Sequence, residues 1–172
     1  MSTAPHMLAP PPAASVSSDS FRETLGRFAT GVTVVTTVGP DGRKVGVTAT
    51  SFGSLSLDPP LIQWSLRRSA YSHTVFSGAD RFAINILAAG QEHVSRVFAS
   101  PVGDRFAATP HRIGEHQLPL IEGALAWLEC ALETRIESGD HSLFIGRVLT
   151  ARIFPHSPLL HWSGAYHHLH AV

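Results

Sequence analysis

The chain has 172 residues, of which 44% are hydrophobic, and its 13 Lys and Arg side chains balance 13 Asp and Glu side chains. A chain of this length can bury a core of its own as one domain, and its balanced charge argues against nucleic acid or a membrane surface as partner. No apolar run reaches the roughly 18 residues of a membrane span, and the single cysteine, Cys130, excludes a disulfide framework and predicts a cytoplasmic protein.

The N-terminal part is interpreted from its composition and spacing. Residues 1–18 are rich in Pro, Ala and Ser, without a basic start or an apolar stretch, and predict a disordered leader before one domain over residues 19–172. Ser20 and Glu23 have the spacing of a capping box. We expect a short amphipathic helix from Ser20 to near Gly31, with an apolar face made of Phe21, Leu25 and Phe28.

Short strands dominate the rest of the pattern. Residues 32–38 are mostly β-branched, turn residues follow at 39–42, and residues 45–52 resume an extended pattern, which predicts a β-hairpin. Residues 124–137 fit a strand face and a helix face equally well, so their period leaves the structure open. The absence of regular strand–helix alternation favours an antiparallel barrel over a doubly wound sheet. Further strands are expected over 61–66, 82–87, 143–153 and 159–162, and helices at about 69–77 and 91–99.

Residues 46–66 are the most informative segment for function. Small hydroxylated residues alternate there with apolar ones, and the segment holds one carboxylate and no base. Hydroxyls and backbone N–H groups can bind a flat neutral heterocycle, and Ala49 and Gly53 let the backbone approach it closely. The chemistry would then belong to the ligand. The hydroxylated residues are Thr48, Thr50, Ser51, Ser54 and Ser56.

An anion site is predicted directly after this segment. Arg67 and Arg68 precede Ser69, a candidate N-cap for the helix expected there. Two cations, a hydroxyl and free backbone N–H groups would then converge where a helix dipole favours an anion. The alternative is a solvated Arg pair beside an ordinary cap.

Five short motifs follow one another along the chain. They are Phe-Ala-Thr-Gly-Val-Thr-Val-Val-Thr at 28–36, Thr-Ala-Thr-Ser-Phe at 48–52, Ser-Leu-Asp-Pro-Pro at 56–60, Gly-Asp-His at 139–141, and Pro-Leu-Leu through Gly-Ala-Tyr at 158–166. Together they resemble the short-chain flavin reductases, the reductase components of two-component flavin-dependent monooxygenases. The resemblance extends from about Phe21 to Leu169. The closing segment departs from it, because the family's frequent Tyr-x-x-Gly-x-Tyr is here His-Trp-Ser-Gly-Ala-Tyr at 161–166.

The resemblance implies a fold and an activity. The fold is mainly β with short helices, a homodimeric FMN-binding split β-barrel of the Greek-key antiparallel kind, in which residues 124–137 form a strand. The activity is reduction of FMN or FAD by a hydride from NADH or NADPH, with reduced flavin passed to a separate monooxygenase. The family holds the flavin ring with the segment that matches Thr48, Ala49, Thr50, Ser51 and Phe52, and the flavin phosphate near the segment that matches Ser65, Leu66, Arg67, Arg68 and Ser69.

The resemblance also assigns residues to the hydride donor. His141, in the Gly-Asp-His motif, corresponds to a histidine beside the nicotinamide, although alone it could equally satisfy a turn carbonyl, and Asp140 could fix its tautomer or cap the turn. Arg105 and Phe106, in an Asp-Arg-Phe loop that resembles the family's, are predicted to bind the cofactor, and Tyr166 to contact NAD(P)H. Loop packing or a place in the core would explain each of the three equally well. Hydride transfer between stacked rings needs no protein nucleophile, so we expect no essential catalytic side chain.

Other patterns limit the alternatives. No Gly-x-Gly-x-x-Gly sequence opens a helix after a strand, so a Rossmann site is not expected. Five histidines between His156 and His170 match no zinc spacing, and no metal site is predicted. Two other functions stay open for a related barrel: an oxidase that retains a flavin or pyridoxal phosphate, and a non-catalytic flavin- or haem-binding protein. The Gly-Asp-His motif favours the reductase over both.

Overall fold

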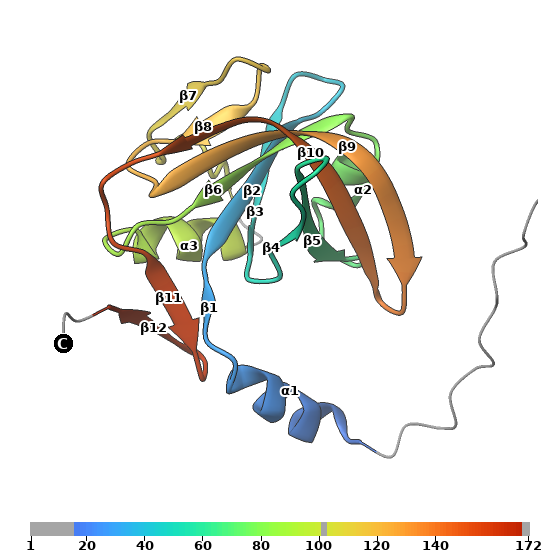
Figure 1. Cartoon of the computed structure of the whole chain (residues 1–172), viewed down its shortest axis with the longest axis vertical. Helices are drawn as coiled ribbons and strands as arrows, with labels where there is room; N and C mark the ends of the chain where they lie inside the picture. The colour runs from blue at the N-terminus through green and yellow to red at the C-terminus, as the bar shows by residue number, and fades with distance from the viewer. Residues whose placement is uncertain (1–15, 101–102, 170–172) are drawn as a thin grey trace, which may run out of the picture.

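The computed structural model describes residues 16–100 and 103–169, and this part of the chain is mainly antiparallel β-structure with three short helices (Figure 1). The predicted leader, residues 1–18, lies almost entirely outside the described residues. No helix in the described ranges has the length and apolar character needed to cross a membrane.

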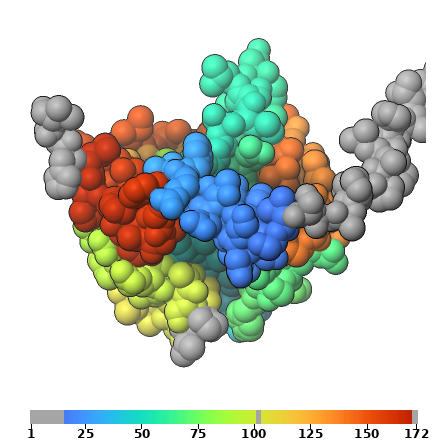
Figure 2. Space-filling model, turned by 90° about the horizontal axis from the view of Figure 1, so that it is seen from below, coloured from blue at the N-terminus to red at the C-terminus, as the bar shows by residue number. Residues whose placement is uncertain are grey.

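The first helix, α1 (Ser18–Gly26), begins before the predicted position. Ser17 is its N-cap, because the Ser17 hydroxyl accepts a hydrogen bond from the Ser20 N–H at 3.2 Å. The predicted cap at Ser20 is therefore wrong, and the helix ends five residues before Gly31. α1 buries none of its residues, and Figure 2 shows it on one face of the molecule beside the C-terminal strands.

The predicted hairpin consists of β2 (Thr33–Val38) and β3 (Lys44–Ala49), which pair antiparallel over their whole length. Gly42, with a φ of 78°, provides the left-handed residue of the connecting turn. β3 ends at Ala49 and not at Phe52 as predicted. Residues 50–52 leave the β2 ladder and lead into β4 (Gly53–Ser56), an edge strand that was not predicted.

A curled seven-stranded sheet forms the body of the molecule (Figure 1). Its order is β3-β2-β6-β9-β10-β5-β4, all pairs are antiparallel, and no ladder joins the edge strands β3 and β4. The mainly antiparallel β fold is therefore confirmed, and residues 124–137 lie largely in β9, as the resemblance implied. The other strands of this sheet are β5 (Leu61–Arg67), β6 (Arg81–Ile86), β9 (Ala126–Ser138) and β10 (His141–Ile153).

Two smaller sheets flank this body. One has the order β1-β11-β12 and the other pairs β7 with β8; of these strands, the sequence pattern predicted β11 alone. Their bounds are β1 (Thr30–Gly31), β7 (His111–Ile113), β8 (Pro119–Ile121), β11 (Leu159–Trp162) and β12 (Ala165–His168). The remaining helices are α2 (His73–Ser77), four residues shorter at its start than predicted, and α3 (Glu92–Ala99).

The core lies on one face of β5 and leaves the other face for a site. Trp64 is fully buried, with its ring centroid 4.7 Å from that of Phe144 and edge-on to Phe76 and Phe82. Successive strand residues point to opposite faces, so Ser65 faces away from this aromatic cluster. Ser65 is half-buried, and the segment that follows β3 approaches it.

Candidate functional site

Residues 48–52, predicted to hold a flavin ring, are tied to β5 by one side chain. The Ser51 hydroxyl donates to the Ser65 carbonyl at 3.1 Å and accepts from the Ser65 N–H at 2.9 Å. These bonds lie directly beyond the Gly53↔Gln63 pair of the β4–β5 ladder. The structure thus brings the two predicted cofactor segments, 48–52 and 65–69, into contact.

The other members of the 48–52 segment differ in what they present to a ligand. Thr48 is already engaged, because its hydroxyl donates to the Ser95 carbonyl of α3 at 2.7 Å. Ala49 is buried, Phe52 packs against the core, and the Ala49 carbonyl already accepts from the Thr33 hydroxyl at 2.7 Å. Thr50 and Ser51 are exposed. The hydroxyls open to a ligand are therefore fewer than the sequence suggested.

The predicted anion site lacks the helix cap on which it depended. α2 starts at His73, with Ser72 as the residue before it, so Ser69 is not an N-cap and the helix-dipole argument at that position is wrong. Ser69 instead lies in the turn between β5 and α2. Five residues of helix are too few to provide an anion site at their start. The Ala70 N–H donates to the Arg67 carbonyl at 3.0 Å and the Arg68 N–H to the Asp140 carbonyl at 2.9 Å, and these bonds hold the turn.

Two exposed cations remain at this position. Arg67 Nε lies 3.9 Å from Asp140 Oδ2, and Arg68 Nη1 lies 4.0 Å from Glu137 Oε2, which are loose and solvated ion pairs. Leu66 between Ser65 and Arg67 packs in the core, and only its backbone is open to a ligand. The site keeps two guanidinium groups that an anionic ligand could recruit.

His141 begins β10 directly opposite Arg67 in the β5 ladder. Its Nδ1 lies 2.7 Å from Asp140 Oδ1, so Nδ1–H donates to the carboxylate and Nε2 is left for another partner. The hydrogen bond from His141 is the main cause that lowers the pKa of the Asp140 carboxyl. Desolvation opposes it, and the charges of His141 and Arg67 add smaller lowering effects. Asp140 therefore orients the His141 ring, an alternative that the sequence left open.

Tyr166 contacts two residues of α3. The Tyr166 hydroxyl lies 2.8 Å from the Ser95 hydroxyl, and the Arg96 guanidinium lies 5.0 Å from the centroid of the Tyr166 ring. Since the Ser95 carbonyl also accepts from Thr48, this fully buried serine joins the predicted flavin segment to the predicted donor residue. Nothing in the sequence pattern singled out Ser95.

Arg105 and Phe106 lie on the outer side of β3. Arg105 Nη1 donates to the Gly46 carbonyl, and burial lowers the pKa of the half-buried Arg105 guanidinium. Phe106 is 7% exposed and edge-on to Phe98 and His111, so it is mainly a core residue. Both residues nevertheless line a pocket of about 850 Å³ that runs beside β3.

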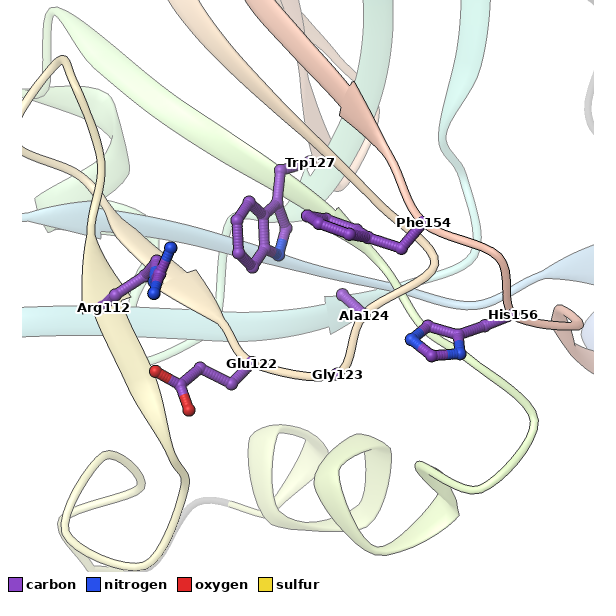
Figure 3. A pocket seen from close by; sticks show the side chains of 7 residues that line it. All are labelled: Arg112, Glu122, Gly123, Ala124, Trp127, Phe154 and His156. Atoms are coloured by element: carbon purple, nitrogen blue, oxygen red, sulfur yellow. The ribbon is translucent and has the colours of Figure 1, made fainter.

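A second pocket, of about 260 Å³, contains none of the predicted site residues (Figure 3). The Trp127 and Phe154 rings form its apolar wall, with Arg112 on one side and His156 on the other. The Trp127 indole N–H donates to the Ile121 carbonyl at 2.7 Å, so this tryptophan is a packed structural residue. Within residues 16–100 and 103–169, no three His, Cys, Asp or Glu side chains gather as a metal site.

Comparison with known proteins gives consistent matches along the chain. The model of the flavin reductase like domain matches residues 25–170. The reductase component of the flavin-dependent trigonelline monooxygenase of Acinetobacter baylyi is 43% identical over 146 residues, which cover 85% of this chain and 47% of that protein. The FMN reductase (NADH) SmoA of Agrobacterium fabrum is 42% identical over 149 residues, which cover 87% of this chain and 84% of that protein.

Solved structures agree with these matches. The NADH:FAD oxidoreductase SgcE6 of Streptomyces globisporus, solved in complex with NAD and FAD fragments, superposes with a TM-score of 0.85 at 38% identity. That superposition covers 92% of this chain and 98% of the other. The chain spans about half the length of several curated relatives that it matches, the trigonelline monooxygenase component among them.

Proposed function

The chain belongs to the flavin reductase-like family, and from this premise we propose that it is an NAD(P)H:flavin oxidoreductase. In this proposal it reduces FMN or FAD and supplies the reduced flavin to a separate monooxygenase. The names of its relatives, an FMN reductase that uses NADH and a reductase component of a monooxygenase, support both parts. The observation that carries the proposal is the convergence of residues 48–52, residues 65–67 and His141 on neighbouring strands.

The chemistry of this surface suits a flavin. The exposed Thr50 hydroxyl and the main chain of residues 50–52, which Ser51 ties to β5, offer neutral hydrogen-bonding groups to a flat polar ring. Arg67 and Arg68 offer two cations to a phosphate, and their present ion pairs are loose enough to exchange. We propose that these residues hold the flavin. A bound flavin supplies the redox chemistry, because it accepts a hydride from a reduced nicotinamide and can pass electrons on.

The protein side chains then act by binding and orientation. His141 is held by Asp140, so its Nε2 can contact the nicotinamide portion of NADH or NADPH. We assign His141 a positioning role, since two aligned rings exchange a hydride without a protein acid, base or nucleophile. Tyr166 is fixed through Ser95 and is proposed to border the donor.

A homodimer is the proposed state in solution. Phe21 and Leu25 lie one turn apart on α1, and their exposed fractions are 57% and 56%. An apolar face of this kind on an otherwise unpacked helix favours association. Sedimentation equilibrium should give a dimer for the native chain and a monomer for Leu25→Asp, and a dimer that persists in Leu25→Asp would exclude α1 from the interface. The buried free thiol of Cys130 supports a reducing, cytoplasmic location.

The activity is tested with purified protein, NADH or NADPH, and a small excess of FMN or FAD in air. Rapid loss of absorbance at 340 nm that depends on added flavin is the expected result. A yellow protein that retains its flavin and oxidises neither nucleotide would reject the reductase in favour of a binding protein. Anaerobic reduction followed by ultrafiltration tests delivery, because a flavin destined for another enzyme must appear reduced in the filtrate.

A further inference from the structure

The pocket of about 850 Å³ is lined by residues that neighbour both proposed flavin segments along the chain. Gly46 on β3 lines this pocket two residues before Thr48, and Tyr71 lines it two residues after Ser69. Its volume lies within the range of roughly 300–1,000 Å³ that is usual for small-molecule sites. The pocket therefore offers room for a part of a ligand that extends beyond the ring and its first phosphate.

The lining of this pocket is positively charged. Three cationic side chains, Arg43, Lys44 and Arg105, face one carboxylate, Asp104. Asp41 balances part of this charge, because Arg43 Nε lies 2.6 Å from Asp41 Oδ2. The Arg105 guanidinium already donates a hydrogen bond to the Gly46 carbonyl. Lys44, the only lysine in the chain, is the remaining cation of the lining.

Lys44 is held in place by an uncharged partner. Lys44 Nζ lies 2.7 Å from His111 Nε2, and His111 Nδ1 lies 2.7 Å from the Thr109 carbonyl. Because that carbonyl can only accept, Nδ1 carries the proton and Nε2 accepts from Lys44. An ammonium group has three N–H donors, so this arrangement orients Lys44 without neutralising it.

The remaining lining suits a flat group. Tyr71 is 80% exposed, an unusual position for a large aromatic side chain, and Phe106 lies on the same pocket as a buried aromatic residue. Gly42 and Gly103 leave parts of the wall without side chains, and a Cβ at either position would meet nothing within 4 Å. A planar base can approach such a wall closely, while its phosphate reaches the cations.

We infer that this pocket binds the adenosine phosphate half of a dinucleotide, with Lys44 beside the phosphate and Tyr71 and Phe106 beside the adenine. The inference rests on the proposed function for its ligands. FAD and NAD(P)H carry this group, whereas FMN and reduced nicotinamide mononucleotide do not. If the flavin occupies the pocket, the pocket would therefore distinguish FAD from FMN. If the hydride donor occupies it, the pocket would distinguish NAD(P)H from reduced nicotinamide mononucleotide.

The first test needs no enzyme activity. The native protein is acetylated with a limiting amine reagent, and the peptide that contains Lys44 is quantified by mass spectrometry. AMP should slow the acetylation of Lys44 more than adenosine or inorganic phosphate does at the same concentration. A lysine-containing peptide in the same tube controls for effects on the reagent itself. Equal protection by AMP and inorganic phosphate, or none by either, would overturn the inference.

The second test identifies the source of the adenosine phosphate. Lys44→Met keeps the length of the side chain and removes its charge, and Arg152→Met removes one exposed cation from β10 as the matched control. If the flavin supplies the group, the FAD:FMN affinity ratio should fall about fivefold in Lys44→Met, the upper range for an exposed ion pair. If the donor supplies it, the KM of NADH should rise by a similar factor relative to that of reduced nicotinamide mononucleotide.

Either shift supports the inference and names the occupant. Equal changes for dinucleotides and mononucleotides, or changes that Arg152→Met reproduces, would overturn it. Failure of the proposed function looks different, because the native protein would then oxidise no NADH with either flavin. The acetylation test would still decide whether the pocket recognises an adenosine phosphate.

Discussion

The Ser51 hydroxyl bonds both main-chain groups of Ser65, donating to its carbonyl at 3.1 Å and accepting from its N–H at 2.9 Å. One side chain thus replaces a pair of ladder bonds at the position where the chain leaves the β2–β3 hairpin. The backbone of residues 48–52 is held against β5 before any ligand binds. Such preorganisation lowers the entropy that binding would otherwise cost.

Ser51→Ala should therefore weaken flavin binding more than it weakens the fold. The two lost bonds are exposed, so we expect a loss of about 1 kcal/mol in flavin binding, which is about a fivefold rise in Kd. Fluorescence titration with FMN and FAD measures this change. Ser157→Ala, at an exposed serine outside the proposed cofactor segments, is the matched control and should leave Kd as it is. Equal affinities for Ser51→Ala and the native protein would show that the segment needs no such tie.

His141→Ala should affect the hydride donor and spare the flavin. Loss of a contact to the nicotinamide portion predicts a rise of about tenfold in the KM of NADH, equivalent to one charge-assisted hydrogen bond. Flavin Kd should change by less than about twofold, because the His141 side chain bonds Asp140 and is not one of the residues proposed to hold the flavin. Steady-state kinetics with flavin at saturation provides the measurement. A large loss of flavin affinity with a normal nucleotide KM would contradict the positioning role.

The Asp140 carboxyl should titrate below its usual pKa of 3.8 in the folded protein. The hydrogen bond from His141 is the main cause, followed by the charges of His141 and Arg67. A lowered folded-state pKa means that the contribution of this pair to stability is fully present above pH 3.8 and is lost as the pH falls through the folded pKa. Carbon-13 NMR of the carboxyl measures it, and in His141→Ala the pKa should move back toward 3.8. An Asp140 pKa that His141→Ala leaves unchanged would refute the assignment of its cause.

The parts of the fold that depend on local pattern could be predicted from the sequence. β2 is a run of β-branched residues that ends at turn residues, and β5 alternates strictly, so both strands lie within one residue of the predicted bounds. β9 could not be assigned from its period, because its apolar positions fit two structures. Its place between β6 and β10 decides it, since both neighbours supply ladder bonds.

The errors in the predicted helix starts have a common physical origin, because in each case two nearby serines could precede the helix. Ser17 and Ser20 can both cap a helix, and the structure uses Ser17. Ser69 and Ser72 both precede α2, and the turn after β5 delays the helix to His73. Lys44 and Tyr71 were not identified as site residues because they are near neighbours only in space. Their one sequence signal was the position of Lys44 beside a hairpin turn.

The Cys130 thiol should be unreactive in the native protein. Burial, and secondarily the charge of Glu129, raises the pKa of the thiol to about 12, so almost no thiolate exists at pH 8. We expect no reaction with a disulfide reagent on a timescale at which the unfolded protein releases one equivalent of thiol. Absorbance of the released thiolate, in buffer and in guanidinium chloride, makes the comparison. Rapid native reaction would mean that the β6–β9 region opens locally.

Gly146→Ala should destabilise the seven-stranded sheet, because the Gly146 backbone lies against the Phe82 ring. A Cβ at this position would overlap the end of that ring and would lie 3.1 Å from Cys130 Cβ. Phe82 cannot withdraw, since it is 2% exposed and packed edge-on to Trp64. Overpacking of this kind costs about 1–3 kcal/mol, which predicts a fall in Tm of roughly 3–10 °C.

Differential scanning calorimetry tests this prediction against a matched glycine. Gly31 also lies in a strand, and a Cβ there would meet nothing within 4 Å, so Gly31→Ala should leave Tm nearly unchanged. Phe82→Leu shortens the opposing side chain. The fall in Tm of the Gly146→Ala, Phe82→Leu double variant should therefore be smaller than the sum of the falls in the two single variants. Full additivity would show that the cost of Gly146→Ala arises from the β10 backbone and not from its contact with Phe82.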